Sequence, residues 1–320
     1  MTQHPLGSGF TAASTTTDVL AGRDLTGTRV VVTAGHRGLG LVTTRALAAA
    51  GAHVTVATRH PALAARTLAG VDRVAVAGLD LLDPASIDAF TRAWDGPLHV
   101  LVNAANLPAP AQVERDARGV EKQFATGHLG HFQLTTGLLP ALRAAGAARV
   151  VTLSSGAHRF GRIRWEDPGF TTGYHPQAAY AQTKLANVLF SVGLDRRYAA
   201  DGVRGYAVHP GVVLMGALDD PVWAATLREQ GLLDAGGRPV IDPARGKKTP
   251  EQGAATVVFA ATSPLLADVG GVYLKDNDVA PVDDEVRELT ADVIPSDATS
   301  AALDPATAQR LWGFSERLVG

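Results

Sequence analysis

Residues 29–51 read RVVVTAGHRGLGLVTTRALAAAG and contain the transition that decides the fold. Residues 29–34 are mostly β-branched and apolar, as in a strand that other elements cover on both faces. From residue 39 onward alanine and leucine dominate, which favours a helix. Glycines at positions 35, 38 and 40 separate the two stretches. The segment therefore predicts a buried strand, a tight glycine loop and a helix in direct succession.

This succession of strand, glycine loop and helix is the local structure that suits a dinucleotide. Glycine permits a tight turn and a close ligand approach, and the first amides of the helix face the diphosphate. The residues expected to bind the dinucleotide in this loop are Thr33, Gly35, His36, Arg37, Gly38, Leu39 and Gly40. An ordinary strand-to-helix turn remains the alternative.

Short β-branched runs recur along the chain and alternate with helical stretches. The expected strands are residues 29–34, 53–58, 73–78, 98–103, 148–154, 203–209 and 271–274. The expected helices between and after them include residues 39–51, 84–94, 177–200 and 306–318. Such alternation produces right-handed crossovers between parallel strands. The predicted fold class is α/β: a Rossmann-type doubly wound parallel sheet of about seven strands with helices on both faces.

No Pro/Ser-rich linker divides the chain. We expect an extended N-terminal arm at residues 1–25 and one dinucleotide-binding catalytic domain at residues 26–320. Ligands of open α/β sheets bind at the carboxyl ends of the strands. The segment at about 212–250 follows such an end, so it is expected to close over the site as a lid. The tail, about 276–320, is acidic before its final helix.

The composition excludes several classes of function. The 320 residues are 46% hydrophobic and 19% charged, with a net charge of −2 and no basic stripe of the kind that binds nucleic acid. The densest basic cluster, RGKK at 245–248, is interpreted as a solvated loop. The absence of cysteine excludes disulfides and thiolate metal sites. No secretory signal is visible, nor any apolar run of the ~18–20 residues that span a bilayer, so a cytoplasmic protein is predicted.

The choice of cofactor follows from the end of the second strand. An NAD site usually has an acid there to hold the ribose hydroxyls. This chain reads ATRH at 57–60, and Arg59 joins Arg37 of the glycine loop. Two guanidinium groups suit a 2′-phosphate, so NADP(H) is predicted over NAD(H). The alternative is that both arginines are merely solvated.

Tyr180 and Lys184 in YAQTK are four residues apart on an expected helix and so share one face. A free phenol, with a pKa near ~10, is a weak acid–base group at neutral pH. A neighbouring ammonium and the positive nicotinamide ring of a bound cofactor both favour the phenolate and lower that pKa. Tyr180 is therefore expected to exchange a proton with a substrate oxygen. Ser155 ends the fifth strand and is expected to hold the same oxygen, with Ser154 as its close competitor.

Several motifs together resemble the short-chain dehydrogenase/reductase family, particularly its retinol-dehydrogenase-like branch. They are TAGHRGLG (33–40), LDLLD (79–83), LVNAAN (101–106), FATGHLGHFQLT (124–135), VVTLSSGAH (151–158), AYAQTKLANVLF (179–190), HPGVV (209–213) and LWGFSERL (311–318). The resemblance implies that Ser155, Tyr180 and Lys184 are catalytic, with Lys184 also holding the nicotinamide ribose. The further cofactor contacts expected are Asp80, Leu81, Asn103, Ala104, Ala105, Pro210, Gly211 and Val213.

The same resemblance implies reversible carbonyl and alcohol chemistry. We therefore expect an NADP(H)-dependent carbonyl reductase or alcohol dehydrogenase, with Tyr180 as general acid and base. Its partner would be a small, largely apolar carbonyl or alcohol. The resemblance also favours a homodimer or homotetramer, built through two long helices around 114–145 and 176–200. The sequence does not identify the substrate or the direction of turnover.

Four positions depart from the family pattern. Ala34 replaces the first glycine, residues 103–106 read NAAN for NNAG, Gly127 replaces an asparagine before HLG, and Met215 replaces a threonine. Alanine at position 34 is tolerated only at a negative φ. The family asparagine is thought to hold a water that relays protons from the lysine. Two hypotheses stay open: a working oxidoreductase with an altered relay, or a diverged NADP(H)-binding relative with a non-redox acid–base or regulatory role.

Other candidate residues have simpler interpretations. His128 and His131 are three apart with no carboxylate nearby, and the resemblance gives them a structural place on a helix, so no metal is predicted. His158 and His175 are interpreted as surface loop histidines. Ser155 lacks the G-x-S-x-G pattern of a hydrolase nucleophile. The aromatic candidates for an apolar substrate pocket, with core packing as the alternative, are Phe160, Trp165, Tyr174 and Trp223.

Overall fold

The computed structural model describes residues 3–107, 110–215, 221–288, 290 and 293–320, without the side chains of 221–223. One sheet of eight strands, in the order β3-β2-β1-β4-β5-β6-β7-β8, forms its centre. The strands are β1 (Arg29–Thr33), β2 (His53–Thr58), β3 (Val74–Gly78), β4 (Val100–Asn103), β5 (Ala148–Leu153), β6 (Val203–His209), β7 (Val272–Lys275) and β8 (Asp278–Val279). The first seven are parallel, which confirms the predicted sheet. The two-residue β8, antiparallel to β7, was not predicted.

Helices connect the strands and cover the sheet. The α-helices are α1 (Thr16–Leu20), α2 (Gly38–Ala49), α3 (Pro61–Thr67), α4 (Pro84–Ala93), α5 (Lys122–Phe124), α6 (Gly130–Gly137), α7 (Leu139–Ala144), α8 (Pro176–Tyr198), α9 (Pro221–Glu229), α10 (Pro250–Thr262) and α11 (Pro305–Val319). A π-helical turn, Ala125–Leu129, joins α5 to α6. Short 3₁₀ turns lie at Gly156–Phe160, Ala199–Asp201, Pro243–Arg245, Pro264–Leu266 and Ser300–Leu303. No helix among the described residues is both long enough and apolar enough to cross a bilayer.

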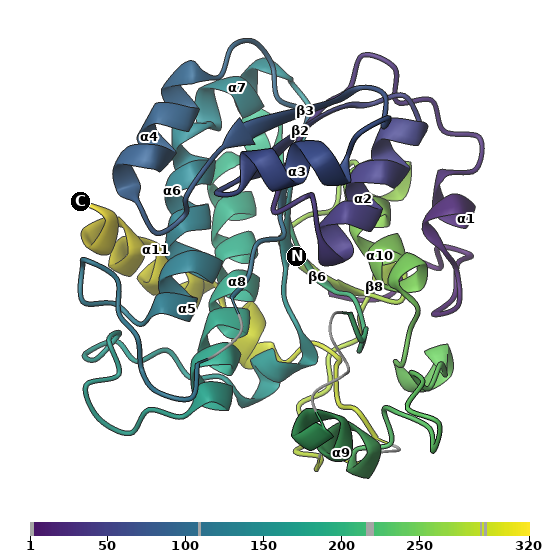
Figure 1. Cartoon of the computed structure of the whole chain (residues 1–320). Helices are drawn as coiled ribbons and strands as arrows, with labels where there is room; N and C mark the ends of the chain where they lie inside the picture. Colours follow the sequence, from purple (N-terminus) through teal and green to yellow (C-terminus); the bar gives the residue numbers. More distant parts are fainter. Residues whose placement is uncertain (1–2, 108–109, 216–220, 289, 291–292) are drawn as a thin grey trace.

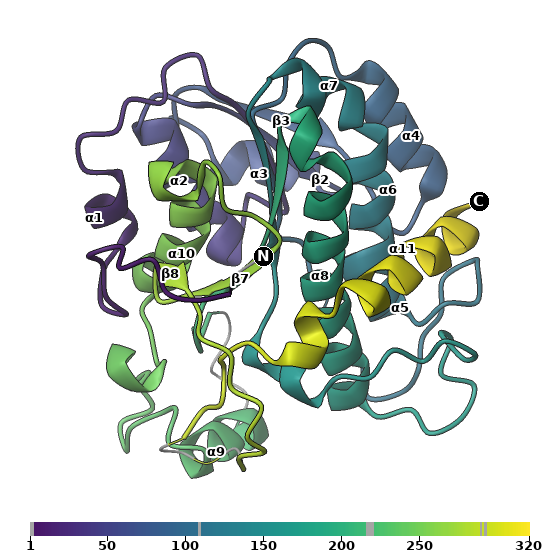
Figure 2. The ribbon, with the colours of Figure 1, turned by 180° about the vertical axis from the view of Figure 1, so that it is seen from behind.

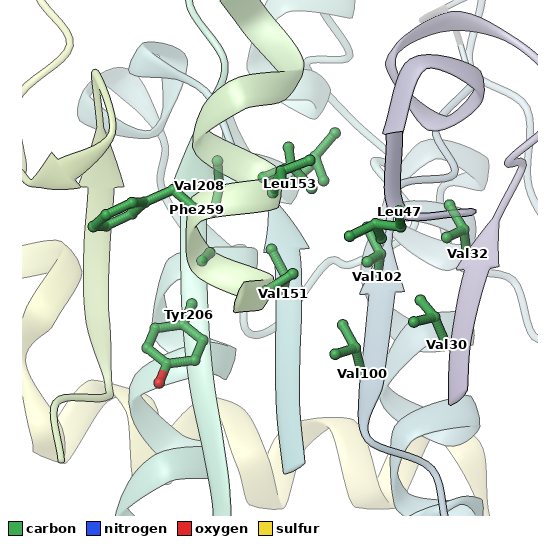
Figure 3. Close-up of a cluster of buried hydrophobic side chains, with 14 of the residues drawn as sticks. Val30, Val32, Leu47, Val100, Val102, Val151, Leu153, Tyr206, Val208 and Phe259 are labelled. Carbon is green, nitrogen blue, oxygen red and sulfur yellow. The ribbon is translucent and has the colours of Figure 1, made fainter. Parts of the chain in front are cut away.

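Both faces of the sheet are buried, because successive side chains of a strand point to opposite faces. Val30 and Val32 lie in one apolar cluster with Leu47 of α2 and Phe259 of α10, as Figure 3 shows. Val31, between them, lies in a second cluster with side chains of α4, α6 and α8. In Figures 1 and 2 the two sets of helices flank the sheet from opposite sides. This double cover explains why the strands are continuous apolar runs rather than alternating ones.

The helix expected around 114–145 is wrong at its start, because the chain becomes helical only at α5. The carboxylate of Asp116 accepts hydrogen bonds from the backbone amides of Arg118 (2.9 Å) and Val120 (3.0 Å). Such local bonds offer the backbone an alternative to the helix. The buried Glu121 carboxylate then caps α5 by accepting from its first free amides.

The N-terminal arm, described from residue 3, is tied to the sheet edge. The carboxylate of Asp278 in β8 accepts hydrogen bonds from three successive amides, residues 6–8. Phe10 packs edge-on against Phe259 of α10. The expectation of an extended arm is wrong at α1, where a capping box between Thr15 and Asp18 starts a short helix. Figure 2 shows the arm running along β7 and β8.

The interpretation of RGKK as a solvated loop is wrong for its two lysines, which are buried. The Lys248 ammonium lies 2.6 Å from the Asp276 carboxylate, and Lys247 Nζ donates to the Gly231 carbonyl at 2.9 Å. Both bonds hold the segment that follows α9. Helix α9 itself lies at the bottom of Figure 1, away from the helices that flank the sheet. Residues 216–220 of the expected lid lie outside the described residues.

Close packing of α8 on β6 yields a stability prediction. A Cβ added at Gly205 in β6 would lie 2.5 Å from the Ser191 carbonyl oxygen of α8. Gly205→Ala is therefore expected to push α8 away and to lower the free energy of unfolding by about 1–3 kcal/mol. Gly78→Ala, in β3, is the matched control, because nothing lies within 4 Å of its added Cβ. Urea unfolding of both variants measures the difference, and equal stability would contradict this packing.

Candidate functional site

The glycine loop joins β1 to α2 by close packing. A Cβ added at Gly35 would lie 2.6 Å from Thr44 Oγ1, and one at Gly40 would lie 2.8 Å from the Ala34 carbonyl oxygen. Gly38 has a φ of +56°, which glycine adopts without penalty. Ala34 has a φ of +53°, so the expectation of a negative φ at this alanine is wrong. The turn holds Ala34 in the left-handed region at a cost of roughly 1–2 kcal/mol.

A pocket opens beside this loop at the carboxyl ends of β1 to β4. Its lining consists of Thr33, Ala34, His36, Arg37, Ala57, Thr58, Arg59, His60, Leu79, Asp80, Leu81, Ala105, Asn106, Leu107 and Thr126. Arg37 and Arg59 also line an adjoining pocket together with His36 and His60. The fold thus brings the two arginines singled out from the sequence, and two histidines, to one place.

The electrostatics of this pocket favour an anion. Burial lowers the pKa of His36, and the charges of Arg37 and His60 lower it further. Both ring nitrogens of His36 are buried and have no hydrogen-bond partner in the described part of the chain. The guanidinium groups of Arg37 and Arg59 make this pocket positive, and an incoming anion would offset that charge.

Two expected cofactor residues, Asn103 and Ala104, lie behind the pocket, and a third, Ala105, belongs to its lining. Asn103 Nδ2 donates to Thr135 Oγ1 and Thr152 Oγ1, both at 3.3 Å. The backbone amides of Ala104 and Ala105 both donate to Thr33 Oγ1, each at 2.9 Å. These bonds fix the end of β4 against the end of β1.

The remaining expected cofactor residues gather at the start of α10. A Cβ added at Gly253 would lie 2.5 Å from Val213 Cγ2 and 3.2 Å from both Leu39 Cδ2 and the Pro210 carbonyl oxygen. Gly211, with a φ of +85°, lines a separate pocket at the ends of β6 and β7. The Pro-Gly turn therefore lies on the β6 side, away from the arginines.

Three hydrogen bonds lock α8 to the end of β5. Lys184 Nζ and Asn187 Nδ2 both donate to the Leu153 carbonyl, at 3.2 Å and 2.9 Å, and Ser154 Oγ donates to the Lys184 carbonyl at 2.8 Å. Ser154 therefore has a packing role, which resolves its competition with Ser155. We call these three bonds the β5–α8 lock.

The β5–α8 lock brings Ser155, Tyr180 and Lys184 together. Ser155 follows β5 and its Oγ accepts from the Ala157 amide at 3.2 Å. Its side chain lies near enough to that of Tyr180 to lower the pKa of the phenol. Lys184 Nζ lies 5.3 Å from the centre of the Tyr180 ring. The arrangement places a hydroxyl, a phenol and an amine around one point at the carboxyl edge of the sheet.

Burial dominates the protonation of the Tyr–Lys pair. It raises the pKa of the Tyr180 phenol, and the neighbouring Ser155 side chain only partly offsets that rise. Burial also lowers the pKa of Lys184 to about 8. Among the protein's own groups, the expected lowering of the Tyr180 pKa by the lysine is therefore wrong. The physical reason is that desolvation disfavours the charged form of both groups.

The chain matches the short chain dehydrogenase family model over residues 28–223. A probable oxidoreductase of Streptomyces lividans is 48% identical to it, over 91% of this chain and 97% of the relative. Human polyprenol dehydrogenase is 37% identical, over 76% of this chain and 75% of the relative. The chain belongs to the short-chain dehydrogenase/reductase family. A crystal structure of a protein from Mycobacterium Paratuberculosis shares the fold, with a TM-score of 0.72 and 30% identity over 96% of this chain and 97% of that one.

In this short-chain dehydrogenase, two departures from the family pattern lie in different surroundings. Gly127 is buried in the π-helical turn, and its carbonyl lies 3.1 Å from His131 Nδ1. The other ring nitrogen of His131 lies 2.9 Å from Thr33 Oγ1. Met215 is 41% exposed at the edge of the described segment. Gly127 is thus linked to β1 through a histidine, whereas Met215 faces solvent.

Five histidines of this short-chain dehydrogenase are buried, and burial lowers the pKa of each: His36, His128, His131, His158 and His209. Burial lowers the pKa of His128 to about 3 and that of His131 to about 4. His128 Nε2 lies 2.8 Å from Ser315 Oγ of α11. The interpretation of His158 as a surface residue is wrong: it is buried, its Nδ1 lies 2.7 Å from the Ser155 carbonyl, and burial lowers its pKa to about 4. His175 is exposed, as expected.

The aromatic candidates for a substrate pocket do not converge. Trp165 packs edge-on against Phe314 of α11, and Tyr174 donates its hydroxyl to the Pro110 carbonyl at 2.8 Å. Phe160 is 53% exposed. The side chain of Trp223 lies outside the described part of the chain. Core packing therefore explains Trp165, and Phe160 is the one exposed side chain of the three that the structure describes.

Eight residues that line the pocket beside the glycine loop were not among the expected cofactor contacts: Ala34, Ala57, Thr58, His60, Leu79, Asn106, Leu107 and Thr126. Asn106 and Leu107 follow β4 directly, and the rule that ligands meet the carboxyl ends of strands points to them. Thr126 carries no such signal, because the π-helical turn that presents it depends on packing against α8.

The buried ammonium of Lys184 yields a prediction with a definite pH dependence. Below pH 8 both the folded and unfolded chains hold the proton, so folding carries the full cost of burying the charge. Between about 8 and 10.5 only the folded chain has lost it, so stability rises with pH. Lys184→Met is therefore expected to be more stable than the parent by roughly 2–3 kcal/mol at pH 7. Urea unfolding at pH 7 and pH 10 tests this, and a gap that does not shrink at pH 10 would contradict it.

Proposed function

We propose that the protein is an NADP(H)-dependent oxidoreductase that interconverts a ketone or aldehyde with an alcohol. One observation carries the proposal: Ser155, Tyr180 and Lys184 meet at the carboxyl edge of the sheet, beside the pocket that Arg37 and Arg59 line. Family membership supports it, because short-chain dehydrogenases use nicotinamide cofactors.

The residues of the pocket fit a dinucleotide with a 2′-phosphate. Arg37 and Arg59 offer planar guanidinium groups, which bind phosphate with paired hydrogen bonds. The two unpartnered ring nitrogens of His36 offer further contacts in the same place. Gly40 lets α2 begin close to the pocket, where its first amides favour the diphosphate. When bound, the cofactor supplies or accepts the hydride.

The chain's own residues handle the substrate oxygen and its proton. In our proposal Ser155 donates a hydrogen bond to that oxygen, and Tyr180 gives the proton during reduction or takes it during oxidation. Lys184 holds the ribose and provides a positive charge near the phenol. The raised pKa of Tyr180 keeps its proton in place at neutral pH, which suits reduction. Oxidation needs the phenolate, so its rate is expected to rise with pH.

An apolar substrate is the proposed partner. The relative from human carries a polyprenol in its name, and its sequence aligns with three quarters of this chain. We propose that segment 212–250 closes over such a substrate, since it follows the carboxyl end of β6. A long-chain prenyl aldehyde therefore belongs in any substrate panel, beside small ketones. We also propose a homodimer or homotetramer, although the broken helix at 122–144 changes the surface that would form it.

Tyr180→Phe tests the proton transfer. We expect NADPH oxidation with the aldehyde panel to fall at least about 100-fold, because general acid catalysis contributes that much. Binding of NADPH, measured by its fluorescence, is expected to stay within about twofold. Tyr198→Phe, at the far end of α8, is the matched control. Undiminished turnover by Tyr180→Phe, or no NADPH consumption by the parent with any carbonyl, would refute the proposed reaction.

Arg37→Ala tests the choice of cofactor. The variant is expected to lose about tenfold or more in NADPH affinity while its NADH affinity changes little, because only NADPH presents a 2′-phosphate. Arg45→Ala is the control, since Arg45 is exposed on α2 outside the pocket. Equal affinities of the parent for both cofactors would reject the preference for NADP(H).

A further inference from the structure

Asn106 places an unpaired acceptor in the dinucleotide-side pocket. It lies just beyond the end of β4 and belongs to the lining of the pocket beside the glycine loop. Its Oδ1 atom is buried and has no hydrogen-bond partner among the residues that the structure describes. A buried acceptor without a partner costs stability, so it needs a reason.

Gly127 leaves the room that this amide occupies. A Cβ added at Gly127 would lie 3.4 Å from Asn106 Oδ1 and 2.6 Å from Thr183 Cγ2. The first distance is an ordinary contact, whereas the second is too short for any real side chain. The methyl of Thr183 thus fills the place that a Cβ at position 127 would need, and the amide oxygen of Asn106 directly borders that place. The three positions are sterically coupled.

This placement puts the amide beside the reactive face of α8. Thr183 adjoins Lys184 and lies three residues after Tyr180, so all three share one side of the helix. Gly127 contacts His131 through its carbonyl, and the charge of Lys184 acts on His131. The Asn106 oxygen and the Thr183 methyl therefore both lie close to the position of an added Gly127 Cβ, next to the helical turn that carries the phenol and the amine.

Other unpaired amide oxygens differ from that of Asn106. Asn103 Oδ1 and Asn187 Oδ1 also lack partners, but each of these residues is fully buried and donates through Nδ2 to the framework. Neither lines the pocket beside the glycine loop. The hydrogen bonds that Nδ2 donates explain why Asn103 and Asn187 are buried. No hydrogen bond of this kind among the described residues explains the position of the Asn106 side chain.

We propose that Asn106 is a positioning residue of this site: its amide oxygen, lodged in the space that Gly127 leaves, accepts a hydrogen bond from a donor that enters beside Tyr180 and Lys184. The inference rests on the proposed function. The donor is either a hydroxyl or amide of the bound cofactor or a water ordered next to Lys184. Either one would donate a hydrogen bond to Oδ1. Only a donor on the cofactor would make the affinity for the cofactor depend on Asn106.

The steric part of the proposal is tested without activity. Gly127→Asn is expected to lower the melting temperature, because its Cβ meets Thr183. Asn106→Gly combined with Gly127→Asn is expected to recover part of that loss, since it frees the space in front of position 127. Gly127→Ala alone and with Thr183→Ser gives a milder pair in case the asparagine variant does not fold. No recovery in either pair would overturn the shared space.

The functional part is tested with Asn106→Leu, which keeps the shape and removes the acceptor. A purely structural asparagine predicts lower stability for this variant, whereas our proposal predicts an unchanged or higher melting temperature. With NADP⁺ as the probe, fluorescence or calorimetric titration is expected to show about tenfold weaker binding if the donor belongs to the cofactor. If the donor is water, NADP⁺ affinity stays within about twofold, while kcat falls and its pH profile shifts with KM unchanged.

The parent protein separates the possible failures. If it binds NADP⁺ and Asn106→Leu matches it in affinity, kcat and pH profile, the role of Asn106 is refuted and the proposed function stands. If the parent itself binds no NADP⁺ and consumes no NADPH, both the proposed function and this inference are refuted.

Discussion

The β5–α8 lock is the constraint on which the site depends. A parallel strand ends with free carbonyl groups at its carboxyl edge, and here the carbonyl of Leu153 receives both Lys184 and Asn187. Ser154 returns a bond to the helix backbone. Because these bonds join the last residue of β5 to the middle of α8, they set the height at which Tyr180 stands relative to Ser155. The close approach of Gly205 to the Ser191 carbonyl keeps the rest of α8 against the sheet.

The site contains features that lower the stability of the folded protein. The Lys184 ammonium is desolvated, the Tyr180 phenol is pushed toward its neutral form, and Ala34 keeps a left-handed backbone. Each feature lowers stability and needs a rigid surrounding to persist. The two apolar clusters on the faces of the sheet provide that surrounding. The neutral, buried His131 extends it by joining Thr33 of β1 to Gly127 of the π-helical turn.

The sequence predicted the strands almost residue by residue, because each is a continuous apolar run that only a doubly covered parallel sheet accommodates. It also predicted the glycine loop, the serine and the Tyr–Lys pair, whose spacing along strand and helix is local. It was wrong where a local side-chain bond competes with a helix, as at Asp116, and where a polar residue is buried by a distant partner. Lys248 is buried because Asp276 pairs with it, and His158 because it packs beneath Ser155 and against Tyr273.

The sequence by itself determined the order of elements, the carboxyl edge at which functional residues gather, and the cationic character of the dinucleotide pocket. These depend on periodicity, glycine positions and residue type, which are properties of short segments. The tertiary structure alone decided the protonation of Tyr180 and Lys184, the neutral state of the buried histidines and the coupling of Asn106, Gly127 and Thr183. Each of these depends on desolvation or on the contact of atoms from different elements, and neither is encoded in the spacing of residues along one chain segment.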